Sequence, residues 1–182
     1  MIKQNHYHQG YVVNPLSISK IHSKALDFRM DYFHRIDRYG RIDISTILEI
    51  DYGDGRKYAI LESDSNGPMG LTTNDGIIFL APSVYEGAIN GNGRDRFTLA
   101  HEFGHVCLHQ GQIGFARAST SQNKIYENSE WQANEFAGAV LLPDYELVKN
   151  KGASIQILAE QFGVSLECAE IRKEKAQRRG IL

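Results

Sequence analysis

The chain has 182 residues, of which 42% are apolar, 23% charged and 10% aromatic. This apolar fraction excludes a disordered chain, and only 4 Pro with 17 Gly exclude a fibrous or low-complexity one. The 20 Lys and Arg against 22 Asp and Glu leave a net charge of -2, which gives no support to bulk nucleic-acid binding.

The N-terminal residues 1–14 carry one Lys among polar residues and lack the apolar run of a secretory signal. The longest apolar stretches, 76–82 and 136–143, are far shorter than the roughly 20 residues that cross a bilayer. Two cysteines, Cys107 and Cys168, do not make a disulfide framework. We therefore expect a cytoplasmic protein that makes no membrane contact.

An amphipathic helix is predicted from Asn14-Pro15, which resembles a helix start, to about His34. Its apolar residues recur at spacings of three and four: Ile18, Ile21, Ala25, Phe28 and Tyr32. Residues 42–50 fit either a second short helix or a strand.

Two short strands are predicted over 57–61 and 76–81, separated by a polar turn region at 63–70. The second strand is expected to end at Pro82. Because the strands are few and short, we expect a small antiparallel sheet rather than an array of parallel strands and crossover helices.

The second half of the chain is predicted to be helical. One helix runs from Asp95 to Gly111, with Phe97, Ala100, Phe103 (or Gly104) and Cys107 on one side. The polar stretch 112–129 fits a binding loop or a flap. A helix through 133–141 ends at Pro143, and 154–178 is predicted to form two helices broken at Gly163.

Three of the seven His lie on the first of these helices, at His101, His105 and His109. The first two belong to an H-E-x-x-H motif. Positions i and i+4 share a helix face, so both imidazoles can reach one tetrahedral zinc ion. Glu102 can then act as general base on a zinc-bound water, whose pKa the metal lowers toward ~7.

The plainer interpretation of this motif is a surface helix that carries two His and a Glu by chance. The helical pattern that continues through the motif favours a metal site. Gly104 also favours it, because Gly costs a helix interior roughly 1 kcal/mol relative to Ala and so indicates a close approach of another group.

A catalytic zinc site needs a third protein ligand. The next helix offers Glu130, with Asn134 four residues later on the same face, placed to hold the other ring nitrogen of a ligand His. Glu127 is the weaker ligand candidate, and Glu135 is expected to point into solvent.

The residues that carry these motifs resemble a known family. The active-site segment of the ImmA/IrrE metallo-endopeptidases resembles Arg96-Phe-Thr-Leu-Ala-His-Glu-Phe-Gly-His-Val-Cys-Leu-His109. A second signature of that family, E-x-x-A-N-x-F-A followed by L-L-x-P, is similar to Glu130-Trp-Gln-Ala-Asn-Glu-Phe-Ala-Gly-Ala-Val-Leu-Leu-Pro143. Similarity extends over roughly 77–172.

This resemblance implies a zincin-like fold with zinc on His101, His105 and Glu130, and with Glu102 as general base. It also implies cleavage of helix-turn-helix repressors in a bacterial stress or mobile-element switch. A His2Glu donor set is compatible with manganese or iron as well as zinc.

Other polar residues remain candidates by type. His109 fits a role beside the metal ligands or, in our preferred interpretation, a cap on the helix end. Tyr85, Tyr126 and His109 are possible oxyanion donors. His6 and His8 are interpreted as ordinary polar residues of the N-terminal segment.

Residues 154–178 resemble a DNA-binding helix-turn-helix, but Glu167 and Glu170 on the would-be recognition helix oppose phosphate binding. We therefore predict a packed helical pair and no direct nucleic-acid contact. Two alternatives to a peptidase remain: a toxin-like component held by a cognate repressor, and a DNA-binding regulator that uses 154–178.

Together these features predict one α+β, zincin-like metallopeptidase domain over 1–182. It comprises an N-terminal helical part (1–50), a small antiparallel sheet with the active-site helix and the other zinc-ligand helix (51–143), and a C-terminal helical pair (144–182). An exposed strand edge near 77–80 is expected to hold an extended protein substrate by strand addition.

Overall fold

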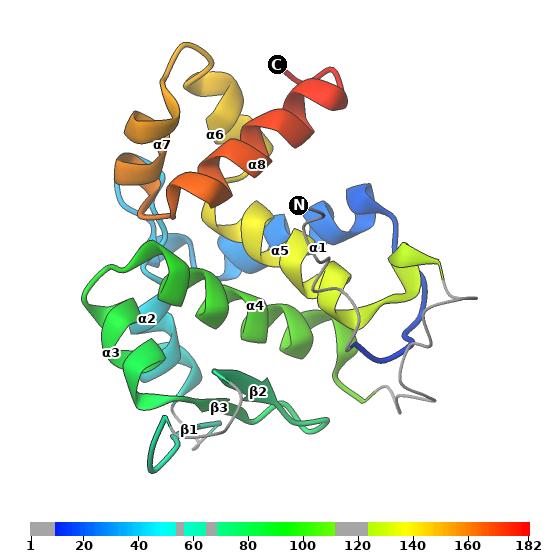
Figure 1. The fold of residues 1–182 in the computed structure, drawn as a ribbon, viewed down its shortest axis with the longest axis vertical. Helices are drawn as coiled ribbons and strands as arrows, with labels where there is room; N and C mark the ends of the chain where they lie inside the picture. Colours follow the sequence, from blue (N-terminus) through cyan, green and yellow to red (C-terminus); the bar gives the residue numbers. More distant parts are fainter. Residues whose placement is uncertain (1–9, 54–56, 65–68, 112–123) are drawn as a thin grey trace, which may run out of the picture.

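The structure of the chain is a computed structural model that describes residues 10–53, 57–64, 69–111 and 124–182. Its architecture is a mostly helical α+β fold with one three-stranded sheet (Figure 1). In chain order the elements are α1 (Ile18–Asp31), η1 (Phe33–Arg35), α2 (Ile44–Thr46), η2 (Ile47–Tyr52), β1 (Tyr58–Ile60), β2 (Gly70–Thr72), β3 (Ile78–Leu80), α3 (Pro82–Ile89), α4 (Gly93–His109), η3 (Ile125–Glu127), α5 (Ser129–Leu141), α6 (Asp144–Lys149), α7 (Ile155–Phe162) and α8 (Leu166–Arg178). No helix within these ranges combines the length and the apolar character that crossing a membrane requires.

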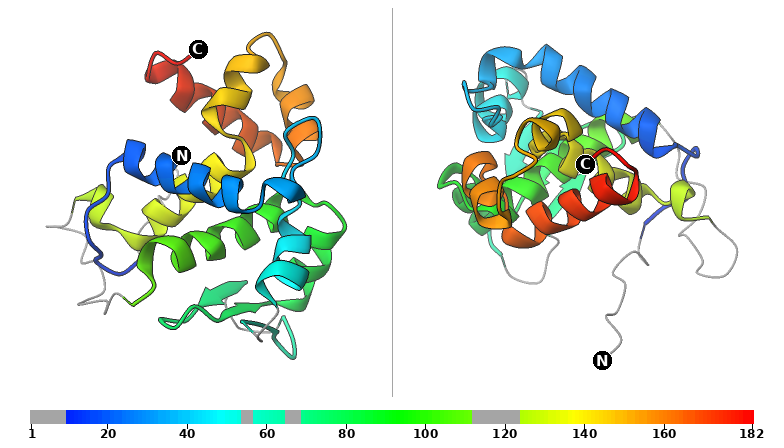
Figure 2. Two further views of the ribbon diagram at one scale, coloured as in Figure 1. Left: turned by 180° about the vertical axis from the view of Figure 1, so that it is seen from behind. Right: turned by 90° about the horizontal axis from the view of Figure 1, so that it is seen from above.

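Helices α4 and α5 lie side by side at the centre of the molecule (Figure 1). Helix α1 packs along α5, the sheet contacts α4 through β2, and α6 to α8 gather at the end away from the sheet (Figure 2). Three rings join the central helices to α1: the centroid of Phe28 lies 5.3 Å from that of Phe103 and 5.8 Å from that of Phe136. The core therefore holds α4 and α5 in a fixed relation to each other.

The first helix begins later than its Asn-Pro pattern predicted. Ser17 caps it, accepting a hydrogen bond from the backbone N–H of Lys20 at 3.2 Å. Residues 10–16 are instead extended and run beside the start of α5, with a β-bridge between Val12 and Asn128. The carbonyl of Asn14, which would accept the first intrahelical hydrogen bond of a helix begun at Pro15, instead accepts from the side chain of Gln132.

Of the two alternatives for residues 42–50, the helix is correct. Asp43 caps α2 by accepting from the backbone N–H of Thr46 at 3.2 Å, and α2 continues directly into the wider turns of η2. Ile44, Ile47 and Leu48 are buried, with exposed fractions of 0–1%. The apolar run thus forms a helix face rather than a strand.

The sheet is mixed, and the expectation of an antiparallel sheet was wrong. Its order is β1-β3-β2: β3 is antiparallel to β2 and parallel to β1. A short turn joins β2 to β3, so these two strands are antiparallel. Strand β1 lies on the other side of β3 and runs in the same direction as β3. Strand β3 is consequently central, so 77–80 is not the exposed edge that we expected near the site.

Two helices, α3 and α6, were not predicted, because Pro82 and Pro143 were interpreted only as ends of the preceding elements. Pro82 is the first residue of α3, and Pro143 immediately precedes α6. Proline lacks the N–H that a first helical turn leaves unpaired, and its φ already suits a helix. Each proline therefore ends one element and begins the next.

The longer helices agree with their sequence patterns. Helix α4 covers the predicted 95–111 closely, and α5 covers 133–141. The C-terminal pair is broken at Gly163, whose φ of +60° is in the left-handed region that favours glycine. Most of the predicted polar loop (112–123), together with His6 and His8, lies outside the described residues.

Glu135 is buried, with 3% of its surface exposed, which corrects the expectation that it is solvated. It forms an ion pair with Lys175 of α8, and its Oε2 lies 3.9 Å from Nε2 of His22 of α1. Helix α5 is covered on every side except where its first turns line a pocket with α4. Glu135 points away from that pocket and is therefore in the core. Burial opposes ionisation of Glu135, but hydrogen bonds from His22 and Lys175 outweigh it and lower its pKa to about 2.

Candidate metal centre

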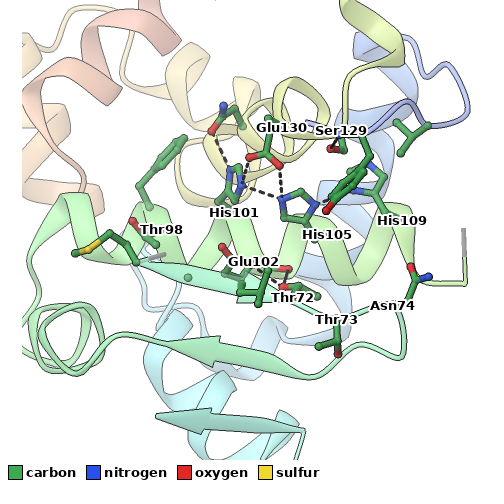
Figure 3. Close-up of a pocket in the computed structure, with 17 residues that line it drawn as sticks. Thr72, Thr73, Asn74, Thr98, His101, Glu102, His105, His109, Ser129 and Glu130 are labelled. Atoms are coloured by element: carbon green, nitrogen blue, oxygen red, sulfur yellow. Dashed lines mark hydrogen bonds and ion pairs between the residues drawn. The ribbon is translucent and has the colours of Figure 1, made fainter. Parts of the chain in front are cut away.

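Helix α4 places His101 and His105 on one face, with their Nε2 atoms 3.0 Å apart. The face is directed toward the space between α4 and the first turn of α5 (Figure 3). Asn92 starts α4 by accepting hydrogen bonds from the backbone N–H groups of Arg94 and Asp95. The helix then runs without interruption through the motif, as two facing ligands require.

Glu130, in the first turn of α5, directs its carboxylate at both imidazoles. Its Oε2 lies 3.2 Å from Nε2 of His101, and its Oε1 lies 3.4 Å from Nε2 of His105. One ligand atom from each of the three residues falls within 4.8 Å of the others. Glu127, the weaker candidate, lies in η3 instead, where its carboxylate accepts from the backbone N–H of Lys124 at 3.1 Å.

The charges of this group favour a bound cation. Burial would raise the pKa of Glu130, but the contacts of its carboxylate with His101 and His105 hold it well below its ordinary value. Burial lowers the pKa of His101 and the Glu130 carboxylate raises it, with a net increase. Two imidazole nitrogens and an ionised carboxylate aimed at one point are a donor set that fits a metal ion.

The other ring nitrogen of each histidine is also held. Nδ1 of His101 lies 2.9 Å from Oδ1 of Asn134, as the spacing on α5 suggested. Nδ1 of His105 lies 3.0 Å from Nδ1 of His109, whose Nε2 lies 3.0 Å from Oε1 of Gln132. Both ring nitrogens of His109 are thus engaged away from the helix carbonyls, which corrects our preferred interpretation of this residue as a helix cap.

Strand β2 holds the carboxylate of Glu102, which is 5% exposed. Thr72 Oγ1 donates a hydrogen bond to Oε2 of Glu102 at 2.7 Å. A Cβ at Gly70 would lie 2.6 Å from Oε1, so only glycine leaves room for the carboxylate in this position. Neither Thr72 nor Gly70 has a local signal in the sequence, because their contact with Glu102 depends on where the sheet meets α4.

The profile of the IrrE N-terminal-like domain, a peptidase family, matches residues 65–174. The chain belongs to this family. Comparison with curated proteins and with solved structures gave no match. The matched span of the IrrE-like domain begins before β2 and ends within α8, so it contains the His-His-Glu group and the strand that holds Glu102. The chain is accordingly a metallopeptidase, as the motif predicted.

The metal centre of the IrrE-like domain opens into a pocket of about 680 Å³. Glu102 and Glu130 are the only Asp, Glu, Lys or Arg among its described lining residues. The remaining lining residues are apolar, polar uncharged or histidine, and they comprise Tyr11, Val13, Met69, Gly70, Leu71, Thr72, Thr73, Asn74, Phe97, Thr98, His101, His105, His109, Ser129 and Asn134. Such a surface suits a neutral stretch of peptide.

Two of the three candidate oxyanion donors lie away from this pocket. Tyr85 donates its hydroxyl to Oε1 of Glu49 at 2.5 Å, and Tyr126 lines a separate apolar hollow beside Trp131. His109 lines the pocket, as does Tyr11, which was not among the residues predicted for the site. Tyr11 reaches the pocket because its backbone pairs with Ser129, a contact that local sequence does not reveal.

Gly104 allows α4 and α5 of the IrrE-like domain to approach closely. A Cβ there would lie 3.0 Å from Cα and 3.1 Å from O of Ala133 on α5. We expect Gly104→Val to push the helices apart, lowering the free energy of unfolding by about 1–3 kcal/mol and weakening metal binding. Urea denaturation and zinc titration measure the two effects.

Gly104→Ala is the matched control for this variant. Its smaller side chain and a helix-propensity gain of up to roughly 1 kcal/mol should leave it closer to wild type. If Gly104→Val bound zinc as tightly as the wild type, the close approach would not matter to the site.

Proposed function

We propose that this IrrE-like domain is a zinc-dependent endopeptidase of zincin-like fold that hydrolyses a peptide bond in a helix-turn-helix transcriptional repressor. The observation that carries the proposal is the His101, His105 and Glu130 group, with the Glu102 carboxylate in the same pocket. The resemblance of the two signature segments to ImmA/IrrE peptidases supports the class of substrate. The near-neutral net charge also favours a protein partner over DNA.

Zinc would be held by Nε2 of His101, Nε2 of His105 and the carboxylate of Glu130. When bound, it would supply a Lewis acid for the peptide carbonyl and make water acidic enough to lose a proton near neutral pH. Asn134 and His109 keep the two imidazoles in orientation through their Nδ1 atoms.

Glu102 is the residue that we propose moves the proton. Its carboxylate can take a proton from the attacking water and pass it to the leaving amine. Thr72 occupies Oε2 by donating to it, so Oε1 remains as the proton acceptor. The absence of a Cβ at Gly70 leaves room for Oε1.

The substrate backbone would lie along β2. Strand β2 pairs with β3 on one side, and no other described strand pairs with its far side. Residues 69–73 line the pocket along this edge, next to Glu102. An extended peptide can add to such an edge by main-chain hydrogen bonds, and the exposed side chains of Met69 and Leu71 offer apolar contacts.

Thr72→Val is expected to lower kcat by roughly tenfold, the equivalent of one hydrogen bond to a charged group. Zinc affinity should not change, because Thr72 does not contact the His-His-Glu group. Steady-state kinetics and zinc titration measure these quantities. Thr72→Ser, which keeps the hydroxyl, should restore most of kcat; equal losses in the two variants would contradict the role of the hydroxyl.

The helical pair at the C-terminus gives little support to the DNA-binding alternative. Arg172 and Arg179 form ion pairs with Asp144, and Lys175 forms one with Glu135. Arg172 is also buried, with 3% of its surface exposed. Basic side chains that neutralise the protein's own carboxylates are poorly placed to bind phosphates.

The decisive experiment is incubation of the purified chain with zinc and candidate helix-turn-helix repressors encoded nearby, followed by mass analysis. We expect two fragments from one repressor, and none when a chelator is present. Intact repressors in every reaction would overturn the proposed substrate. Stable copurification without cleavage would favour the toxin-like alternative, and a salt-sensitive gel shift unaffected by chelator would favour DNA binding.

A further inference from the structure

A chain of hydrogen bonds leads from the metal centre into the core through His109 to Gln132. Gln132 lies on α5 and is fully buried, and His109 is 8% exposed. Nδ1 of His105 lies 3.0 Å from Nδ1 of His109, and Nε2 of His109 lies 3.0 Å from Oε1 of Gln132. Each of these hydrogen bonds needs one donor and one acceptor. Once the donor and acceptor atoms of one residue are known, those of the other residues in the series follow.

The backbone around Gln132 fixes that member. Its Nε2 donates to the carbonyl oxygens of Asn14 and Tyr126, at 2.8 Å each. Carbonyl oxygens can only accept, so the amide nitrogen must face them. The opposite orientation of the amide would place Oε1 against two other oxygens in a buried site, at the cost of two hydrogen bonds. Oε1 of Gln132 therefore faces His109.

The protons of the two imidazoles follow from this orientation. Because Oε1 of Gln132 accepts, Nε2 of His109 carries a proton and donates it. A neutral imidazole has one N–H, so Nδ1 of His109 accepts, and its donor is the N–H at Nδ1 of His105. The lone pair of His105 is then on Nε2, the nitrogen that lies 3.4 Å from Glu130.

We infer that Gln132 and His109 form a relay that fixes the tautomer of His105 and so presents its Nε2 to the metal. This inference rests on the proposed zinc site. His101 needs only the direct contact with Asn134, whereas His105 is oriented through a second imidazole. The relay ends on carbonyls of the N-terminal segment and of η3, so two segments outside α4 and α5 position a metal ligand.

Zinc affinity tests the relay through a double-mutant cycle. Gln132→Met removes the amide at similar size, and His109→Phe removes the acceptor for His105 while leaving Gln132 on its two carbonyls. We expect each variant to bind zinc about 10- to 100-fold more weakly than wild type. The double variant should be no weaker than the weaker single variant, because either change already interrupts the relay. The affinities are measured by competition with a chromophoric chelator.

Gln161→Met is the matched control, since the Gln161 amide also donates to a backbone carbonyl, that of Tyr39, but on α7. It should bind zinc as the wild type does. The relay would be overturned if the fold-losses in zinc affinity of the two single variants multiplied in the double variant. It would also be overturned if either single variant bound zinc with wild-type affinity. A wild-type protein that binds no zinc would instead overturn the proposed function itself.

A second measurement does not depend on the variants folding. Long-range proton–nitrogen NMR of the zinc-loaded wild type, labelled with ¹⁵N-histidine, reports which ring nitrogen carries the proton. We expect His109 to carry it on Nε2 and His105 on Nδ1. A proton on Nδ1 of His109 would reverse the chain and contradict the inference, whatever the zinc affinities are.

Discussion

Glu102→Gln is expected to lower kcat by at least about a hundredfold while leaving the zinc affinity unchanged. A general base contributes on the order of 10² to 10⁴ to the rate, and a neutral amide cannot take the proton. Glutamine has the size of glutamate and can accept the same hydrogen bond from Thr72. The three proposed metal ligands are unchanged in this variant. Cleavage kinetics and a zinc competition titration measure the two quantities.

His105→Ala is the matching control, because it should lose both activity and zinc. It removes an Nε2 that lies 3.0 Å from Nε2 of His101 and 3.4 Å from Glu130. A Glu102→Gln protein as active as the wild type would disprove the role of Glu102. A His105→Ala protein with wild-type zinc affinity would place the metal elsewhere.

Acid should destabilise the fold as pH falls from about 4.5 to about 2. Interactions with His22 and Lys175 lower the pKa of Glu135 from 4.5 to about 2 in the folded protein. A folded-state pKa below the unfolded value stabilises the fold above the unfolded pKa, and this stabilisation is lost as pH falls through the folded pKa. The loss from Glu135 is on the order of 3 kcal/mol, and Asp144, whose pKa is also lowered, adds to it. Urea denaturation at a series of pH values measures it.

Glu135→Gln separates this effect from general acid sensitivity. The variant should be less stable than the wild type at neutral pH, because Lys175 loses its buried partner. The two proteins should converge below pH 2, where Glu135 becomes mostly protonated. Parallel stability curves for the two proteins across this range would show that Glu135 is not responsible.

The sequence predicts best what depends on local spacing. His101 and His105 are four residues apart in a continuous helical pattern, and Glu130 and Asn134 are four apart in the next. Gly104 also has a local signal, its cost in a helix interior. These regularities are enough to suggest which side chains meet, because two helices brought together by their apolar stripes leave few arrangements.

What the sequence misses depends on contacts between distant segments. The hydrogen bond from Thr72 to Glu102 and the pairing of Tyr11 with Ser129 arise only when the sheet and the N-terminal segment are placed against α4 and α5. Strand order is of the same kind, since 77–80 has the pattern of any short buried strand. The burial of Glu135 was missed because a charged residue usually indicates the solvent-exposed face of a helix. Helix α5 is covered on nearly all sides and has no such face.

The burial pattern of α5 limits how this protein can change. Every residue from Ser129 to Leu141 is buried except Glu130 and Asn134, which line the pocket. The helix therefore has no position that is neutral with respect to both folding and the site. We expect a saturation library across α5 to tolerate mainly substitutions that conserve volume, because other changes disturb either the core or the pocket. Diversification toward new substrates is left to Met69 and Leu71 at β2 and to Tyr11 and Val13, which line the same pocket without holding Glu102.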